Sequence, residues 1–129
     1  MTITLITASF LGLLFFYLSY GVVKNRFRAK VSIGSGGDEG LENAIRAHAN
    51  FAEYVPLVLV LFGLLETQGV NEYLLIAMAA FFTVGRYMHG LTFGKFEGRN
   101  PFRFWGIIFT WVVLLVASIT GLVLGFNLL

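Results

Sequence analysis

Residues 3–23 have the sequence ITLITASFLGLLFFYLSYGVV and include no charged side chain. At about 1.5 Å of rise per residue, a helix of these 21 residues spans roughly the 30 Å of a bilayer's hydrocarbon core. The stretch therefore predicts a membrane-spanning helix. A cleaved signal peptide carries positive charge before its apolar stretch, whereas here the basic residues follow it, so we expect the helix to remain attached. These residues are Lys24, Arg26, Arg28 and Lys30.

Three further apolar stretches are long enough to cross a membrane, and short polar segments separate them. The predicted helices lie at about 2–24, 41–66, 72–94 and 102–127. All four belong to one domain that covers the whole chain, residues 1–129. Pro56 lies inside the second helix, which a membrane helix tolerates when neighbouring groups satisfy the freed carbonyl. The predicted fold is all-α, an integral membrane four-helix bundle.

The composition of the whole chain favours a bilayer as its solvent. Of the 129 residues, 57% are hydrophobic and 12% are charged, about half the charged fraction of an average soluble domain. The chain has no cysteine, which excludes disulfides, thiolate metal sites and a cysteine nucleophile. Two histidines are too few for a zinc site made by the protein alone, and a net charge of +2 is not typical of nucleic-acid binding. We therefore expect neither a bound metal nor a nucleic-acid partner.

All nine lysines and arginines lie in or beside two of the three expected loops. The first loop and its flanks hold Lys24, Arg26, Arg28, Lys30 and Arg46, and the third holds Arg86, Lys95, Arg99 and Arg103. By the positive-inside rule both basic loops are cytoplasmic, and both termini lie on the opposite side of the membrane. Short loops without a targeting sequence are typical of a bacterial inner membrane protein, and we expect that location.

Polar side chains interrupt the apolar pattern of the second helix along one face. At about 100° per residue, Arg46, Asn50, Glu53 and Tyr54 share a stripe roughly 100° wide. An ionisable group inside a membrane costs at least about 2.5 kcal/mol, so these side chains need partners.

The third helix has a second polar stripe, in which Arg86 and His89 share a face, and the two stripes can face each other. One interpretation is an ion pair between Arg46 and Glu53 within the bundle. The charges favour another, because Glu53 is the one carboxylate embedded among five arginines. These are Arg26, Arg46, Arg86, Arg99 and Arg103. A small zwitterion with more than one carboxylate would complete the set, since guanidinium groups bind carboxylates well and Glu53 could receive an ammonium group.

Residues 46–56, RAHANFAEYVP, closely resemble the helix-two signature of the MAPEG family, the membrane-associated proteins in eicosanoid and glutathione metabolism. Arginine, asparagine, glutamate, tyrosine and proline recur in that family at this spacing. The resemblance extends to residues 26–31, to 85–89 and to 99–103, and so covers essentially the whole chain. It implies a homotrimer of four-helix subunits with glutathione bound between neighbouring subunits near the cytoplasmic surface.

The resemblance also implies roles for individual side chains. Arg46, Asn50, Glu53 and Tyr54 would hold the tripeptide, with help from Arg26, Arg86 and His89. Arg103 matches the arginine that lies beside the glutathione sulfur in such enzymes, and Arg99 is the alternative for that role. Glutathione would be a co-substrate whose thiolate attacks a lipophilic electrophile dissolved in the bilayer, by conjugation or by reduction of a lipid hydroperoxide.

Two other functions stay open at this point. A binding protein that retains the glutathione pocket without thiolate chemistry is one, because Phe93 stands where several family members have tyrosine. A small multidrug-type transporter is the other, since four short helices with a membrane-embedded Glu53 are typical of such exporters. Transport ranks last, because exporters of cations use a lone carboxylate and here arginines surround it.

Overall fold

The computed structural model describes residues 1–95 and 99–128, and within these ranges it contains four α-helices and no strand. They are α1 (Thr2–Ala29), α2 (Glu39–Thr67), α3 (Glu72–Thr92) and α4 (Pro101–Asn127). Each helix is long and apolar enough to cross a membrane. The prediction of an all-α chain with four such helices is confirmed.

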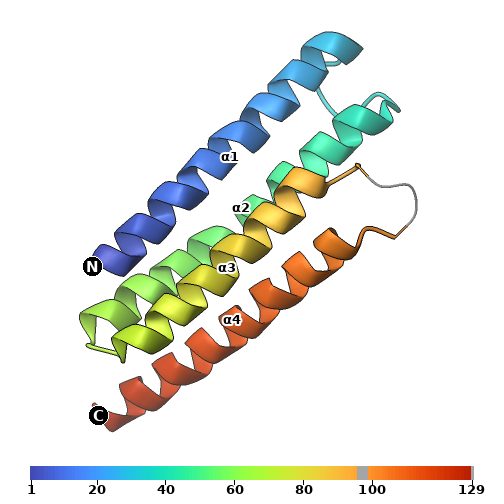
Figure 1. The fold of residues 1–129 in the computed structure, drawn as a ribbon. Coiled ribbons are helices and arrows are strands. Elements are labelled where there is room, and N and C mark those ends of the chain that lie inside the picture. Colours follow the sequence, from blue (N-terminus) through green and yellow to red (C-terminus); the bar gives the residue numbers. More distant parts are fainter. Residues whose placement is uncertain (96–98, 129) are drawn as a thin grey trace.

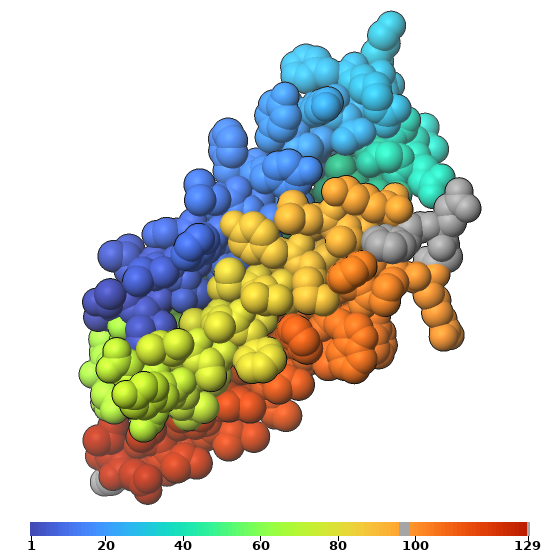
Figure 2. Space-filling view, viewed as in Figure 1, coloured from blue at the N-terminus to red at the C-terminus, as the bar shows by residue number. Residues whose placement is uncertain are grey.

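The four helices run alternately up and down the long axis of the molecule. Figure 1 shows both termini and the α2–α3 turn at one end, with the α1–α2 loop and the start of α4 at the other. The two basic segments therefore lie at the same end. Helices α2 and α3 form the centre, because each packs on the other and on both outer helices, whereas no described Cα of α1 lies within 8 Å of one in α4. In Figure 2, α3 covers most of α2, with α1 and α4 on either side.

Large apolar side chains from one face of each helix fill the interior. On α1, Leu11, Leu14 and Leu18 recur at intervals of three and four residues and are buried, as expected for a helix with one inward face. Phe62 of α2 and Phe82 of α3 pack edge to face, with ring centres 6.0 Å apart. The outward faces are also apolar, as the exposure of many large hydrophobic side chains shows. This is the surface expected of helices whose surroundings are lipid rather than water.

Helix α1 continues to Ala29, beyond the predicted end at residue 24. Polar residues extend a helix past the hydrocarbon core without cost, since their side chains are then hydrated. Arg26 and Arg28 in the last turn also favour the negative end of the helix dipole. The helix ends at Lys30, which has a positive φ of 57° and donates its backbone N–H to the Arg26 carbonyl.

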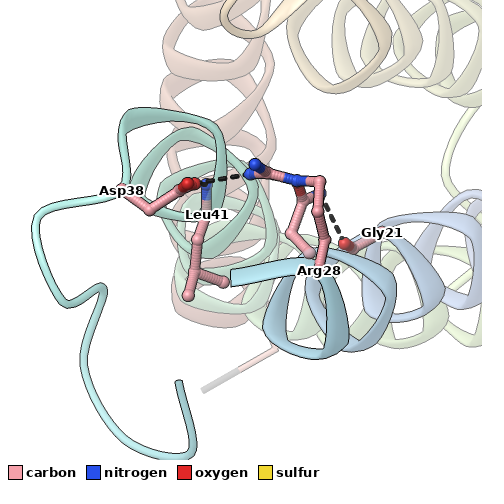
Figure 3. Close-up of polar contacts among 5 residues, drawn as sticks. Gly21, Arg28, Asp38 and Leu41 are labelled. Atoms are coloured by element: carbon pink, nitrogen blue, oxygen red, sulfur yellow. Dashed lines mark hydrogen bonds and ion pairs between the residues drawn. The ribbon is translucent and has the colours of Figure 1, made fainter. Parts of the chain in front are cut away.

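Polar contacts between the end of α1 and the start of α2 hold the first loop, as Figure 3 shows. Arg28 Nη2 donates to Asp38 Oδ1 at 2.6 Å, and the same oxygen accepts the backbone N–H of Leu41 at 2.7 Å as the cap of α2. Hydrogen bonding to Arg28 and to the backbone lowers the pKa of Asp38. On the other side, Asn25 accepts from Arg28 and donates to the Gly21 carbonyl at 2.8 Å.

At the opposite end of the bundle, a side chain of α2 caps α1. The Glu66 carboxylate accepts the backbone N–H groups of Ile3 and Thr4 at 2.9 Å each and lies 3.5 Å from the α-ammonium of Met1. The first N–H groups of a helix have no partner within it, and the residue before α1 offers no side-chain cap. Glu66 therefore supplies through tertiary contact what a local capping residue supplies elsewhere.

We expect Glu66→Gln to lower the free energy of unfolding by about 1–2 kcal/mol, because the amide retains one acceptor oxygen and loses the charge. Thermal unfolding in detergent, followed by circular dichroism, measures the change. Glu72→Gln is the matched control, since Glu72 is an exposed carboxylate at the same end and no hydrogen bond to its side chain is found within the described residues. Equal unfolding temperatures for the two variants would contradict the capping role.

Candidate functional site

The interior of the bundle holds a charged side chain, Arg86 of α3, which is 0% exposed. Its Nη2 donates to Asn50 Oδ1 on α2 at 2.9 Å, and its Nη1 donates to Thr110 Oγ1 on α4 at 3.4 Å. The guanidinium carbon also lies 5.6 Å from the centre of the Phe51 ring. One side chain thus links three helices. Within residues 1–95 and 99–128 it forms no ion pair with a carboxylate, and its Nε is buried without a hydrogen-bond partner.

Two glycines bring α3 and α4 close together beside this arginine. A Cβ atom added to Gly106 would lie 2.5 Å from the Gly85 carbonyl oxygen and 2.9 Å from the Cβ of His89. Real Cβ atoms essentially never make contacts this short, so only glycine fits at position 106 without a shift of the backbone. The close approach lets Thr110, one turn further along α4, reach the Arg86 guanidinium.

His89 lies one turn after Arg86 and faces the same interior. Its side chain is 2% exposed, its Nδ1 is buried without a hydrogen-bond partner among the described residues, and its ring centre lies 5.4 Å from that of Phe93. The spacing of three residues predicted that Arg86 and His89 share a face, and both point inward. The contact of Arg86 with Asn50 is the point where the polar stripes of α2 and α3 meet.

Arg46 and Glu53 lie on the outer surface of α2. Both are exposed, and neither forms an ion pair with any residue in the described ranges, so the predicted alternative of a pair within the bundle is not present there. Glu53 is 14 residues from the start of α2, about 21 Å along the helix and near its middle. Tyr54 beside it is half-buried, and its hydroxyl accepts from Trp111 Nε1 at 3.3 Å.

Arg103 lies in the first turn of α4. Its guanidinium carbon is 4.5 Å from the centre of the Phe93 ring, a cation–π contact across the α3–α4 connection. Asn100 holds this region together, since its Nδ2 donates to the Thr92 carbonyl at 2.7 Å while its Oδ1 accepts the Arg103 backbone N–H. Arg99, the alternative to Arg103, is exposed and has no polar partner among the described residues.

Arg26 has a different surrounding from the other predicted site residues. Its Nη1 donates to the carbonyl oxygens of Ser32 at 3.1 Å and Gly34 at 3.0 Å. Within this chain its guanidinium therefore closes the α1–α2 loop, at the end of the bundle where α4 begins. These contacts lie within the chain and do not test the predicted role of Arg26 toward glutathione, which stays a prediction.

The model of the MAPEG family matches residues 4–123 of the sequence. The chain belongs to the MAPEG family. It is 32% identical over 113 residues to the Inner membrane protein YecN of Escherichia coli strain K12, a match covering 86% of this chain and 83% of that protein. The Inner membrane protein YecN of Escherichia coli O6:H1, strain CFT073, matches with the same identity and coverage. No solved structure matches the chain.

Apolar grooves lie at two places on the described surface of this MAPEG chain, and neither is lined by a predicted site residue. One, of about 340 Å³, lies between α3 and α4 and is bordered by Met78, Phe81 and Phe109. The other, of about 530 Å³, lies between α2 and α4 near the ends opposite the basic loops. Arg46 and Glu53 of α2 are instead exposed, so a pocket around these two side chains requires a surface from outside this chain.

The sequence analysis did not identify three residues that contact the predicted site residues Arg86 and Tyr54. Thr110 accepts from Arg86, Trp111 donates to Tyr54, and Phe51 packs against the Arg86 guanidinium. Thr110 is one of three hydroxyl side chains in the apolar fourth helix, with Ser118 and Thr120, so its polarity was a signal but did not single it out. Nothing in the sequence distinguished Phe51 from the other phenylalanines, of which the chain has 14 in all.

Proposed function

We propose that this protein is a glutathione-dependent membrane transferase or peroxidase, which stabilises the glutathione thiolate for attack on a lipophilic electrophile or hydroperoxide. Membership of the MAPEG family indicates a glutathione-related function in a membrane. The observation that carries the proposal is that Arg46 and Glu53 are exposed on one face of the apolar helix α2 and form no ion pair within the described residues.

The charged groups of glutathione are of the kind that could pair with Arg46 and Glu53. The tripeptide carries two carboxylates and one ammonium group, so a carboxylate can pair with Arg46 and the ammonium with Glu53. An isolated charge in the membrane costs at least about 2.5 kcal/mol, and pairing with a ligand removes much of that cost. Asn50 and Tyr54 on the same stripe add neutral hydrogen bonds. Arg26, Arg86 and His89 support this site from the loop and from the interior.

The outward direction of Arg46 and Glu53 supports assembly as a homotrimer, in which a neighbouring subunit covers this face of α2 and glutathione lies between the two. The protein is proposed to lie in a bacterial inner membrane, since the relatives are described as inner membrane proteins. Its basic loops and site face the cytoplasm, and both termini lie on the other side, in agreement with the positive-inside rule.

Arg103 is the proposed catalytic residue. A free thiol has a pKa of about 8.5, and a nearby guanidinium stabilises the thiolate and lowers that pKa. Arg103 lies in the first turn of α4, where the helix dipole adds positive potential. The thiolate would then attack an electrophile that reaches it from the bilayer. Arg99, a few residues earlier, is the alternative donor of positive charge.

A second candidate function is glutathione binding without catalysis. The contact of Arg103 with Phe93 favours it, because the ring engages the guanidinium and offers no hydroxyl to a substrate or to the sulfur. The two candidates share a binding site and differ in whether bound glutathione is ionised.

Titration of the detergent-solubilised protein with reduced glutathione, followed by calorimetry, tests the site. We expect saturable binding by the wild type and affinity weaker by about tenfold or more in Glu53→Gln, because a charged hydrogen bond is worth about 1.5–3 kcal/mol. Glu42→Gln is the matched control, since Glu42 is also an exposed carboxylate of α2. A wild type that does not bind would reject the function, and equal binding by wild type and Glu53→Gln would reject this position for the site.

A further inference from the structure

The contact between Arg86 and Asn50 fixes which atom of the Asn50 amide faces the interior. A guanidinium group has five N–H donors and no acceptor. The amide atom 2.9 Å from Arg86 Nη2 must therefore be the carbonyl oxygen, because an NH2 group there would place donor against donor. The chemistry of arginine thus settles an orientation that is ambiguous for most asparagines.

The guanidinium that sets this orientation is itself held firmly. Arg86 is 0% exposed, donates to Thr110 on α4 and packs against the Phe51 ring. Rotating the Asn50 amide by half a turn would leave Nη2 of a buried cation without an acceptor, which is costly in a membrane interior. The amide of Asn50 is therefore locked.

The other end of the amide is available. Asn50 Nδ2 has no hydrogen-bond partner within the described residues and is not among their enclosed unpaired atoms, so the described part of the chain leaves it accessible. Arg46 lies one turn before Asn50 on α2, and Glu53 lies one turn after it. Asn50 thus presents two N–H donors, and no acceptor, between an exposed cation and an exposed carboxylate.

We propose that Arg86 is a positioning residue that makes Asn50 a donor-only contact, so that Asn50 binds an oxygen acceptor of the guest, a carboxylate or a peptide carbonyl. Arg86 does not touch the guest, because it is enclosed. This inference rests on the proposed function. It adds that Asn50 acts as a hydrogen-bond donor to the guest and that Arg86 determines this direction.

Asn50→Asp is the decisive variant. Aspartate keeps the shape of asparagine and an oxygen toward Arg86, and it replaces the donor NH2 by an acceptor. In calorimetric titration with reduced glutathione we expect the affinity to fall by about tenfold or more, with an unfolding temperature at or above that of the wild type, because a carboxylate now faces the buried guanidinium. Asn43→Asp controls for the added charge, since it lies two turns earlier on α2, and it should bind nearly as the wild type does.

A double-mutant cycle tests the role of Arg86. Glutamine carries an acceptor as well as a donor, so Arg86→Gln releases the Asn50 amide to rotate. We expect Arg86→Gln and Asn50→Ala each to weaken binding, and the double variant to lose clearly less than the sum of the two losses, because Arg86 acts through Asn50. If Arg86→Gln does not fold, Asn50→Asp and Asn43→Asp carry the test alone.

The outcomes separate this inference from the function on which it rests. A wild type that binds glutathione, together with Asn50→Asp that binds equally well, would overturn the donor-only contact and leave the proposed function intact. Losses from Arg86→Gln and Asn50→Ala that add fully would overturn the positioning role. A wild type that shows no binding would overturn the function and this inference together.

Discussion

Replacing Gly106 by leucine is expected to abolish the folded bundle, and replacing it by alanine to lower the free energy of unfolding by about 1–3 kcal/mol. The added Cβ would lie 2.5 Å from the Gly85 carbonyl oxygen and 3.0 Å from the His89 backbone nitrogen. Both atoms belong to the backbone of α3, so no side-chain rotation relieves the clash. Helices α3 and α4 must separate, and Thr110 then moves away from Arg86.

Circular dichroism during heating in detergent measures this effect, and size-exclusion chromatography reports loss of the folded species. Gly125→Leu and Gly125→Ala are the matched controls on the same helix, because a Cβ at Gly125 meets no atom within 4 Å. We expect both controls to unfold near the wild-type temperature. A Gly106→Leu variant as stable as Gly125→Leu would show that the close contact of α3 with α4 does not stabilise the protein.

Replacing Arg103 by alanine is expected to remove the thiolate of bound glutathione while leaving the tripeptide bound. With a thiol pKa of about 8.5 only about 3% is ionised at pH 7, whereas a pKa lowered by about two units gives roughly three quarters thiolate. Loss of the guanidinium should therefore reduce the thiolate by about 25-fold. Ultraviolet absorbance of the thiolate at saturating glutathione measures it, and calorimetry on the same sample reports binding.

Arg99→Ala is the matched control for this experiment. It removes an exposed arginine from the same connection, and we expect the thiolate signal to persist. Loss of the signal in Arg99→Ala but not in Arg103→Ala would transfer the role to Arg99. A wild type that binds glutathione without any thiolate signal would favour binding without catalysis, in agreement with the contact of Phe93 on Arg103.

The helices of this protein were predictable because the bilayer imposes a length on each apolar stretch. The same constraint does not determine where a helix ends outside the lipid. The extension of α1 to Ala29 was therefore not predicted. Its last turns are polar, and the cap at Lys30 ends them. Long-range capping by Glu66 was equally inaccessible to sequence reasoning, because it joins residues more than 60 positions apart.

For the candidate site, helical periodicity placed residues on a shared face of a helix but did not determine whether that face packs against another helix or lies on the surface. A stripe about 100° wide straddles the border between buried and exposed surface. Asn50 therefore contacts Arg86 in the interior, whereas Arg46 and Glu53 on the same stripe point outward. The family resemblance supplied a ligand for these residues, and their roles toward glutathione remain predictions that the titrations above decide.

The enclosed guanidinium of Arg86 also bears on how the protein reaches its membrane. A charged residue at the centre of a helix raises the free energy of insertion by about 2.5–3.5 kcal/mol, and Arg86, six residues before the end of α3, carries part of that cost. Helix α3 is therefore expected to partition into lipid less readily than α4, which has no charge after Arg103. The acceptors for Arg86 come from Asn50, synthesised earlier, and from Thr110, synthesised later. We therefore expect stable insertion of α3 to depend on the helices translated before and after it, because they supply these acceptors.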